Sequence, residues 1–368
     1  MQTTKELQKT VIVLGMHRSG TSAITNVLNS SGLYCGDEKE LLPNDQFNEK
    51  GYYERKEVVD LNEVILDQGF ALASQNNANV SGELSRAALT GYGWVKGAWL
   101  PALAQILNKM EPERSLAEYV KNVYAQANGR HMVLKDPRLS LTLPVWQPHL
   151  GSTLIVMMIR DPDEVSRSLM ERNELPDFVT QPLWTSYNQS ALRVTTGCPR
   201  LLVNYHDLIN SPKETVKKLF EFLDQNGIAD VHDHFSDAVS SISSELYHSK
   251  PADIPSAYRA SNNHAKNYYN NIVRNHISLE KEGELYEIDR DNLTTDYWLQ
   301  LATTYISSMV MLDQTRNKLD QCRNNYAASI NRLNSHPIAG LVIKTLRYLK
   351  RDRTFGNINP NENSSFKK

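Results

Sequence analysis

Short runs of apolar residues recur through the first two thirds of the chain and are separated by segments with helical patterns. Four of these runs are rich in Val, Ile, Leu and Met: residues 11–15 (VIVLG), 131–135 (HMVLK), 153–160 (TLIVMMIR) and 200–205 (RLLVNY). Continuous rather than alternating apolarity is typical of strands that are buried on both faces of a parallel sheet. The pattern predicts an α/β fold with helices on both faces of the sheet, in which ligands bind at the carboxyl ends of the strands.

The segments around these strands are predicted to be mostly helical. Residues 55–128 read as a helical insertion, within an α/β domain that spans 1–290. A helical extension follows at 291–356, and the polar residues 357–368 are expected to be a disordered tail.

Residues 295–335 are predicted to form one long helix. Leu312, Leu319, Tyr326 and Leu333 recur every seven residues in it. This recurrence leaves open a coiled coil between two copies, and hence a homodimer. The favoured alternative is a helix that packs on its own domain, because Arg316 and Arg323 interrupt the second apolar seam.

Composition and charge narrow the class of protein. The 368 residues carry a formal net charge of -2, so no basic field favours nucleic acid as a partner. The three cysteines are widely spaced, and the first ten residues lack the apolar core of a signal peptide. These features predict a cytoplasmic protein. Residues 336–353 are apolar on one side and basic on the other, which leaves open contact with the inner face of the membrane; a helix docked on the core is the alternative.

The first strand runs into a glycine-bearing loop, VIVLGMHRSGTSAITNVL at residues 11–28. Gly15 permits a sharp exit from the strand, and Gly20 lets the backbone approach a bound oxyanion at the start of a helix. In nucleotide triphosphatases a lysine follows the second glycine. Thr21 stands there in this chain, and Arg18 is the cation of the loop. The loop predicts anion binding without naming the anion; the alternative is a turn with a surface arginine.

A second motif, IRDPDEVSRSLMER, occupies residues 159–172. Asp161, Pro162 and Glu164 read as a helix start, with a cap, a first-turn proline and a glutamate three residues after the cap. Arg160 ends a strand and Ser168 lies two turns into the helix, so both side chains can converge on one group. The alternative is an ion pair of Arg160 with Asp161 or Asp163, with Ser168 on the helix surface.

Together the two motifs resemble the sulfotransferases that use 3′-phosphoadenylyl sulfate (PAPS), and the resemblance covers residues 10–225. It is closest to bacterial members whose loop reads GMHRSGTS and which also carry GYYE and KDPR, found here at 51–54 and 135–138. The resemblance implies a P-loop-type fold and no required metal. It implies that the 5′-phosphosulfate is bound by the loop, with Gly15, His17, Arg18, Ser19, Gly20, Thr21 and Ser22. Arg160 and Ser168 would bind the 3′-phosphate, and Tyr205 would approach the adenine.

The chain departs from the cytosolic members of that family in two respects, one of which is that no histidine falls in the position of their catalytic base. Their C-terminal Arg-Lys-Gly signature, which completes the 3′-phosphate site, has no counterpart here. A cation from residues 250–275 is the candidate to replace it.

Sulfuryl transfer to a hydroxyl needs a general base, and the resemblance offers three carboxylates. Glu54 ranks first as the last residue of GYYE, Asp136 second, and Glu38 third. Their alternatives are a solvated residue at a helix start for Glu54 and an ion pair with Arg138 for Asp136. Lys135 is expected to contact the sulfuryl group or the acceptor, and Arg18 to stabilise charge on the leaving phosphate.

The acceptor is expected to be a hydroxyl of a glycan or glycolipid, because the most similar bacterial members tend to be associated with surface polysaccharides. Trp94, Trp99, Trp184 and Tyr187 are candidates to stack on sugar rings, although aromatic residues in helical patterns are more often core. Two other functions remain open at this point: a P-loop kinase that uses a nucleotide, and a non-catalytic scaffold assembled through the C-terminal helix.

Overall fold

A computed structural model of the chain describes residues 8–45, 48, 51–76, 114–242, 263–274, 315–316 and 318–332. The chain divides into two compact units, 1–307 and 308–368. In the second unit, residues 315–316 and 318–332 are helical, within the stretch predicted as a long helix. Trp94, Trp99 and the segments 336–353 and 357–368 lie outside the described residues.

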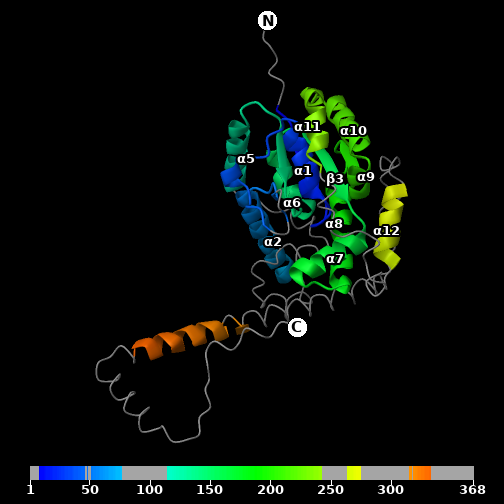
Figure 1. Ribbon diagram of the computed structural model, residues 1–368. Coiled ribbons are helices and arrows are strands. Elements are labelled where there is room, and N and C mark those ends of the chain that lie inside the picture. The colour runs from blue at the N-terminus through cyan, green and yellow to red at the C-terminus, as the bar shows by residue number, and fades with distance from the viewer. Residues whose placement is uncertain are drawn as a thin grey trace, which may run out of the picture. The chain divides into compact units, whose positions relative to one another are not determined.

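The first unit is built on a sheet of four parallel strands in the order β2-β1-β3-β4 (Figure 1). The strands are β1 (Thr10–Leu14), β2 (Met132–Lys135), β3 (Thr153–Ile159) and β4 (Arg200–Asn204). Val13 pairs with Lys135 on one side and with Val156 on the other. Every residue of β1 and β2 is buried. The predicted parallel α/β sheet is therefore confirmed.

Helices cover this sheet, and along the chain they lie between and after the strands. Their bounds are α1 (Thr21–Ser30), α2 (Lys56–Asn76), α5 (Arg114–Ala127), α6 (Leu139–Trp146), α7 (Pro162–Asn173), α8 (Asp177–Val194), α9 (Tyr205–Asn210), α10 (Pro212–Gln225), α11 (Phe235–Ser240) and α12 (Asn263–Arg274). Short 3₁₀ turns lie at Glu38–Glu40, Gln147–His149 and Asp230–His234. Two of the helices, α2 and α5, begin and end the described parts of the predicted insertion.

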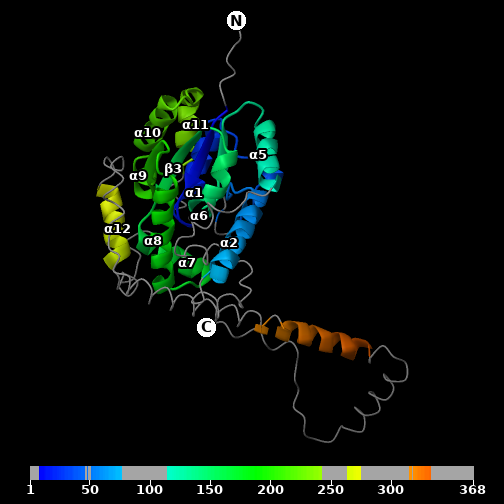
Figure 2. The same ribbon diagram turned by 180° about the vertical axis from the view of Figure 1, so that it is seen from behind.

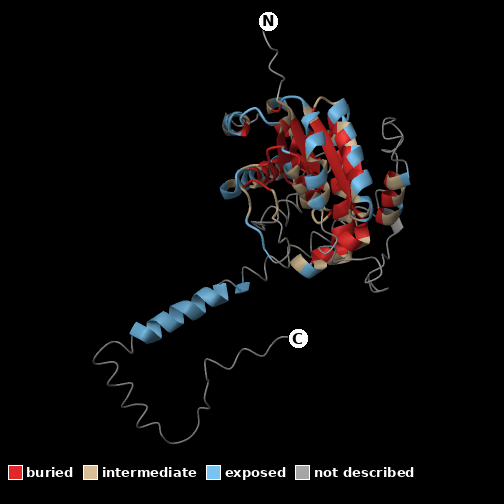
Figure 3. Ribbon diagram, turned by 45° about the horizontal axis from the view of Figure 1, so that its top comes forward, coloured by how far each residue is buried: buried red, intermediate tan, exposed pale blue. Residues whose placement is uncertain are grey.

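The core forms because alternate residues of each strand face opposite sides of the sheet. Val11, Val13 and Val156 belong to an apolar cluster with side chains of α1, α10 and α11. The residues between them, such as Ile12 and Met157, are also fully buried, and on that side α6 packs against α8. Figures 1 and 2 show the helices on both faces, and Figure 3 shows the buried sheet between them.

Parallel pairing brings the carboxyl ends of all four strands to one edge of the sheet. Gly15 follows β1, Asp136 follows β2, Arg160 follows β3 and Tyr205 follows β4. Candidate site residues as much as 190 positions apart in the sequence, such as Gly15 and Tyr205, therefore lie at the same edge of the sheet.

Candidate active site

The loop between β1 and α1 is shaped by two glycines. Gly15 has φ 141°, and a Cβ there would lie 2.5 Å from the carbonyl oxygen of Met158. Its amide donates to Ser140 Oγ over 3.2 Å, which ties the loop to the start of α6. Gly20 has φ 90°, and a Cβ there would overlap the ring of Tyr205. Both positions therefore require glycine for conformation and for space.

The same loop carries the features of an anion site. Gly20 is the N-cap of α1, and the first N–H groups of a helix have no partner within it. Arg18 adopts φ 66°, a left-handed conformation that is uncommon for residues other than glycine. The Ser19 side chain is fully buried, and its Oγ has no hydrogen-bond partner among the described residues. A buried hydroxyl in that state needs an additional partner, and an oxyanion held by the loop would supply one.

Arg18, Arg160 and Ser168 are brought together although the two motifs lie far apart in the sequence. Arg18 Nε donates to Ser168 Oγ over 2.8 Å. Arg160 Nη1 donates to the carbonyl oxygen of Arg18 over 3.1 Å. Burial, and then the neighbouring charge of Arg172, lower the pKa of Arg18. Hydrogen bonds thus join the loop at 15–22 to the segment 159–172 and bring two guanidinium groups together.

Tyr205 connects these residues to the end of β4. The Arg160 guanidinium lies 4.4 Å from the centre of the Tyr205 ring, within the range of a cation–π contact. Burial raises the pKa of Tyr205, so its hydroxyl stays protonated. On the other side, Trp184 Nε1 donates to the carbonyl oxygen of Arg160 over 3.0 Å. Trp184 and Tyr187 are fully buried, so both belong to the core rather than to a sugar-stacking surface.

The principal ion pair of Arg160 was not predicted. Arg160 Nε lies 2.7 Å from Glu164 Oε2, whereas sequence analysis offered Asp161 or Asp163 as partners. Glu164 also accepts from His206 Nε2 over 2.9 Å. The prediction of a helix start is right, since Asp161 caps α7 by accepting from the amide of Asp163. Glu164, interpreted there as part of the cap, is instead a buried anion between two basic side chains.

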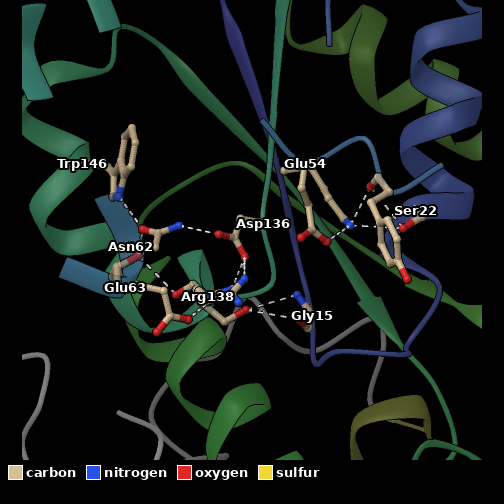
Figure 4. Close-up of polar contacts among 12 residues, drawn as sticks. Gly15, Ser22, Glu54, Asn62, Glu63, Asp136, Arg138 and Trp146 are labelled. Atoms are coloured by element: carbon tan, nitrogen blue, oxygen red, sulfur yellow. Dashed lines mark hydrogen bonds and ion pairs between the residues drawn. The ribbon is translucent and has the colours of Figure 1, made fainter. Parts of the chain in front are cut away.

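Lys135 forms a second cluster with Glu54 and Ser22, which are both labelled in Figure 4. Lys135 Nζ lies 2.5 Å from Glu54 Oε1, and both side chains are almost completely buried. Lys135 also donates to Ser22 Oγ over 3.1 Å and to the carbonyl oxygen of Tyr52 over 2.9 Å. One lysine therefore connects the favoured base to the loop that begins α1.

Asp136 lies next to Lys135 in the sequence but in a different network (Figure 4). Its Oδ1 accepts from the amide and from Nη1 of Arg138, each over 3.0 Å. Its Oδ2 accepts from Asn62 Nδ2 over 2.8 Å. Although burial acts to lower it, the charges of Asp136 and Glu63 raise the pKa of Arg138. Asp136 thus makes the ion pair that sequence analysis gave as its alternative role.

The remaining predicted residues lie as follows. Glu38 is an exposed residue of the 3₁₀ turn Glu38–Glu40. Thr21 is buried at the first position of α1, and Ser22 follows it. His17 makes an edge contact with Tyr187, at 5.6 Å between ring centres. Burial first, and then the charge of Arg138, hold the pKa of His17 well below its ordinary value, so its ring is neutral near pH 7.

A further cation was expected from residues 250–275. Within this stretch the structure describes α12 (Asn263–Arg274). Lys266 of this helix forms an ion pair with Asp161 and lies 3.5 Å from Asp163 Oδ2. Tyr269, on the same helix, accepts from Asn204 Nδ2 over 3.1 Å. A basic residue of α12, Lys266, therefore contacts Asp161, the residue that follows Arg160 in the chain.

Several residues were not predicted to belong to the site, although Glu164 had been interpreted as part of a helix start. Asn62 and Glu63 of α2 reach the KDPR segment, Ser140 fixes Gly15, and Glu164 and His206 adjoin Arg160. A usable signal existed for two of them. Glu164 follows Arg160 by four residues, and His206 follows Tyr205 directly, at the same edge of the sheet.

A family model described as the sulfotransferase family matches residues 10–228, which is more than half of the chain. The chain belongs to the sulfotransferase family. It is thus a PAPS-dependent sulfotransferase by class, as predicted, because members of this family generally take the sulfuryl group from PAPS. The matched residues contain all four strands, the glycine loop and the segment 159–172.

Solved structures of sulfotransferases also resemble the chain. The sulfotransferase domain of a Synechococcus olefin synthase is 17% identical and covers 82% of this chain and 94% of that one, with a TM-score of 0.38. A sulfotransferase from Mycobacterium avium is 16% identical and covers 66% of this chain and 69% of that one, with a TM-score of 0.36. No curated protein matches the chain.

Two features of the described residues bear on membranes and metals. Within them, no helix combines the length and the apolar character that crossing a bilayer requires. Nor, in the same residues, do three His, Cys, Asp or Glu side chains gather where they could bind one metal ion.

Proposed function

We propose that this sulfotransferase binds PAPS across the Arg18–Ser168–Arg160 surface and transfers its sulfuryl group to an acceptor hydroxyl, with Glu54 as the general base. The observation that carries the proposal is the junction of the two phosphate motifs. Arg18 of the loop donates to Ser168 of α7, and Arg160 donates to the backbone of Arg18. A donor with phosphates at both its 5′ and its 3′ positions needs two adjoining anion sites.

The residues present fit such a donor. Glycine is required at positions 15 and 20, and the buried Oγ of Ser19 has no other partner among the described residues. Arg18, the N-terminus of α1, Thr21 and Ser22 are assigned to the 5′-phosphosulfate. Arg160 and Ser168 are assigned to the 3′-phosphate, and Tyr205 to the adenine. His17, which is neutral, can donate or accept a hydrogen bond but adds no charge.

The chemistry then follows from the Glu54–Lys135 pair. Glu54 takes the proton of the acceptor hydroxyl as its oxygen attacks sulfur, while the bond from sulfur to the 5′-phosphate breaks. The electron pair stays on the phosphate oxygen, where Arg18 and the backbone amides stabilise the charge. Lys135 donates to the sulfuryl oxygens, and its bond with Glu54 holds that carboxylate beside the loop before transfer.

Of the three candidate bases, Glu54 has the best geometry. Both oxygens of Asp136 already accept hydrogen bonds, and its side chain has no exposure to solvent. We therefore assign Asp136 to the positioning of Arg138 and Asn62. Glu38 is exposed, with no described contact to Lys135 or to the loop. Lys266 is our candidate for the cation that replaces the missing C-terminal signature, because its helix brings it next to the Arg160 segment.

For the acceptor we propose a hydroxyl of a bacterial glycan or glycolipid, met in the cytoplasm or at the inner face of the membrane. Its support is the similarity of the loop GMHRSGTS and the GYYE and KDPR segments to bacterial sulfotransferases. Incubation of the enzyme with labelled PAPS and either envelope glycans or small phenols tests this proposal. Label in the glycans supports it, and label in the phenols alone contradicts it.

The assignment of the two phosphate sites is tested by comparing two nucleotides. Arg160→Ala is expected to weaken the binding of 3′-phosphoadenosine 5′-phosphate by roughly 10–100-fold, since a hydrogen bond to a charged group contributes about 1.5–3 kcal/mol. The binding of adenosine 5′-phosphate, which lacks the 3′ group, should be weakened far less. Arg167→Ala, a change at a more exposed arginine of α7, the helix that follows Arg160, is the control. Equal weakening of both nucleotides would remove Arg160 from the 3′-phosphate site.

A further inference from the structure

Glu164 is a buried carboxylate that holds Arg160 from the side away from the loop. Its side chain has no exposure to solvent, and its two oxygens have different partners. Oε2 accepts from Arg160 Nε over 2.7 Å, and Oε1 accepts from His206 Nε2 over 2.9 Å. Because the Nε edge of Arg160 is occupied in this way, its Nη1 is turned toward the backbone of Arg18.

His206 is the only member of this trio that solvent reaches to a sizeable extent, with 25% of its side chain exposed. The hydrogen bond to Glu164 is the main cause that raises the pKa of His206 above its ordinary value, against a smaller opposing effect of burial. Among the described residues, the charges of Glu164, Asp161 and Arg160 act on His206. Asp207 is its neighbour on α9, and from α12 Lys266 contacts Asp161 and Tyr269 contacts Asn204. Lys266 pairs with Asp161, so that carboxylate is largely compensated by another cation.

The trio therefore changes charge as a unit. With His206 protonated, one carboxylate stands between two cations and the sum is one positive charge. With His206 neutral, Glu164 cancels the charge of Arg160 and the sum is zero. The hydrogen bond itself survives in both states, since a neutral imidazole still donates from Nε2. Only the field around Arg160 changes.

We propose that Glu164 is a positioning residue for Arg160, and that protonation of His206 strengthens the hold of this site on a 3′-phosphate and thereby makes nucleotide binding depend on pH. The inference rests on the proposed function, because it takes Arg160 as a ligand of that phosphate. It gives Glu164 of the second motif a role other than helix capping, and it adds His206, which lies outside both motifs.

The test is calorimetric titration with 3′-phosphoadenosine 5′-phosphate and adenosine 5′-phosphate between about pH 6.5 and about pH 9. The ratio of the two dissociation constants isolates the 3′ group, because the 5′-phosphate is common to both. The affinity gained from the 3′-phosphate should fall by about three- to tenfold across this range as one nearby charge is lost. Ionisation of the phosphate itself, with a second pKa near ~6, would act in the opposite direction.

His206→Asn should abolish this fall, because asparagine keeps a hydrogen-bond donor but does not titrate. His232→Asn changes a more exposed histidine of the same unit and should leave the fall intact. Glu164→Gln should flatten this fall, because it removes the carboxylate that raises the pKa of His206. A fall that persists in His206→Asn, or a wild-type ratio that does not fall, would overturn the inference.

A second measurement does not depend on the variants being equally stable. By linkage, a bound 3′-phosphate must raise the pKa of His206 further, and adenosine 5′-phosphate should raise it less. NMR titration of the His206 ring, identified by its absence from His206→Asn, measures both. Equal pKa values with the two nucleotides would contradict the inference while leaving the proposed function standing. If the wild-type protein binds neither nucleotide, the proposed function fails and this inference fails with it.

Discussion

Lys135 Nζ lies 2.5 Å from Glu54 Oε1 and 3.1 Å from Ser22 Oγ. The lysine ends β2, the glutamate ends the GYYE segment, and the serine belongs to the first turn of α1. Each comes from a different part of the chain, and they meet because parallel strands end at one edge of the sheet. This contact places a carboxylate and an ammonium group beside the loop to which the sulfuryl donor is assigned.

Glu54→Gln should abolish most transfer without loss of nucleotide binding. Glutamine keeps the length of the side chain and can still accept from Lys135, but it cannot take a proton. We expect turnover to fall by about 10²–10⁴-fold, the range typical of a lost general base. Transfer of label from PAPS measures turnover, and calorimetry with 3′-phosphoadenosine 5′-phosphate measures binding.

Glu38→Gln, a change at the exposed glutamate, is the matched control and should retain full turnover. If instead Glu38→Gln loses transfer and Glu54→Gln keeps it, the assignment of the base is wrong.

Asp136→Asn should affect stability more than chemistry. The change breaks a buried ion pair with Arg138 and disturbs the hydrogen bond from Asn62, so we expect the free energy of unfolding to fall by about 2–4 kcal/mol. Urea denaturation measures it. Glu171→Gln removes a more exposed pair with Arg167 and should cost less than about 1 kcal/mol. A variant of unchanged stability that has lost all transfer would instead identify Asp136 as the base.

Gly20→Ala should damage the loop by steric overlap, not only by backbone strain. A Cβ at Gly20 meets the Tyr205 ring, whereas a Cβ at Gly129, with the similar φ of 85°, meets nothing within 4 Å. Both variants share the cost of a left-handed alanine, about 1–2 kcal/mol. We expect Gly20→Ala to destabilise the protein more than Gly129→Ala does, and to weaken the binding of 3′-phosphoadenosine 5′-phosphate at least tenfold. Equal behaviour of the two variants in calorimetry and urea denaturation would contradict the contact.

The stability of the protein should depend on His206 in acid and not in alkali. Its pKa is raised in the folded state, so its contribution is complete below its unfolded pKa and is lost as pH rises through the folded value. Glu164 has the opposite sign: its pKa is lowered, and its contribution is lost only as pH falls through that lowered value. Near pH 6 the free energy of unfolding of the wild-type protein should therefore exceed that of His206→Asn by about 1 kcal/mol.

That difference should vanish near pH 9, where His206 is neutral in both the folded and the unfolded protein. Urea denaturation at several pH values measures it. A difference that grows toward alkaline pH would contradict the His206–Glu164 ion pair.

The sheet was predictable because buried parallel strands are marked by continuous apolar runs. All four predicted strands are present, and each is followed directly by a candidate site residue: Gly15, Asp136, Arg160 or Tyr205. The loop was predictable for a related reason, since Gly15 and Gly20 are required by backbone geometry that few other residues can adopt.

The partners of the charged residues were not predictable in the same way. Arg160 had three acidic residues within reach along the chain, and sequence spacing does not say which one lies on its side of the helix start. Asp136 follows the apolar strand β2, and Glu54 precedes α2, so the sequence offers two acidic candidates in unlike surroundings. Only the fold shows that the first is enclosed by Asn62 and Arg138, and that the second is paired with Lys135. Contacts between distant side chains depend on the packing of α2, α7 and α9, and the local pattern does not encode them.

The central claim is that the loop after β1 holds a phosphosulfate rather than a triphosphate. The most direct test is calorimetric titration of the wild-type protein with 3′-phosphoadenosine 5′-phosphate and with ATP, each with magnesium and with a chelator. We predict that the 3′-phosphorylated nucleotide binds in the presence of chelator, and that Arg18→Ala weakens it at least tenfold whereas Arg167→Ala does not. Binding of ATP that requires magnesium, with no binding of 3′-phosphoadenosine 5′-phosphate, would contradict the account.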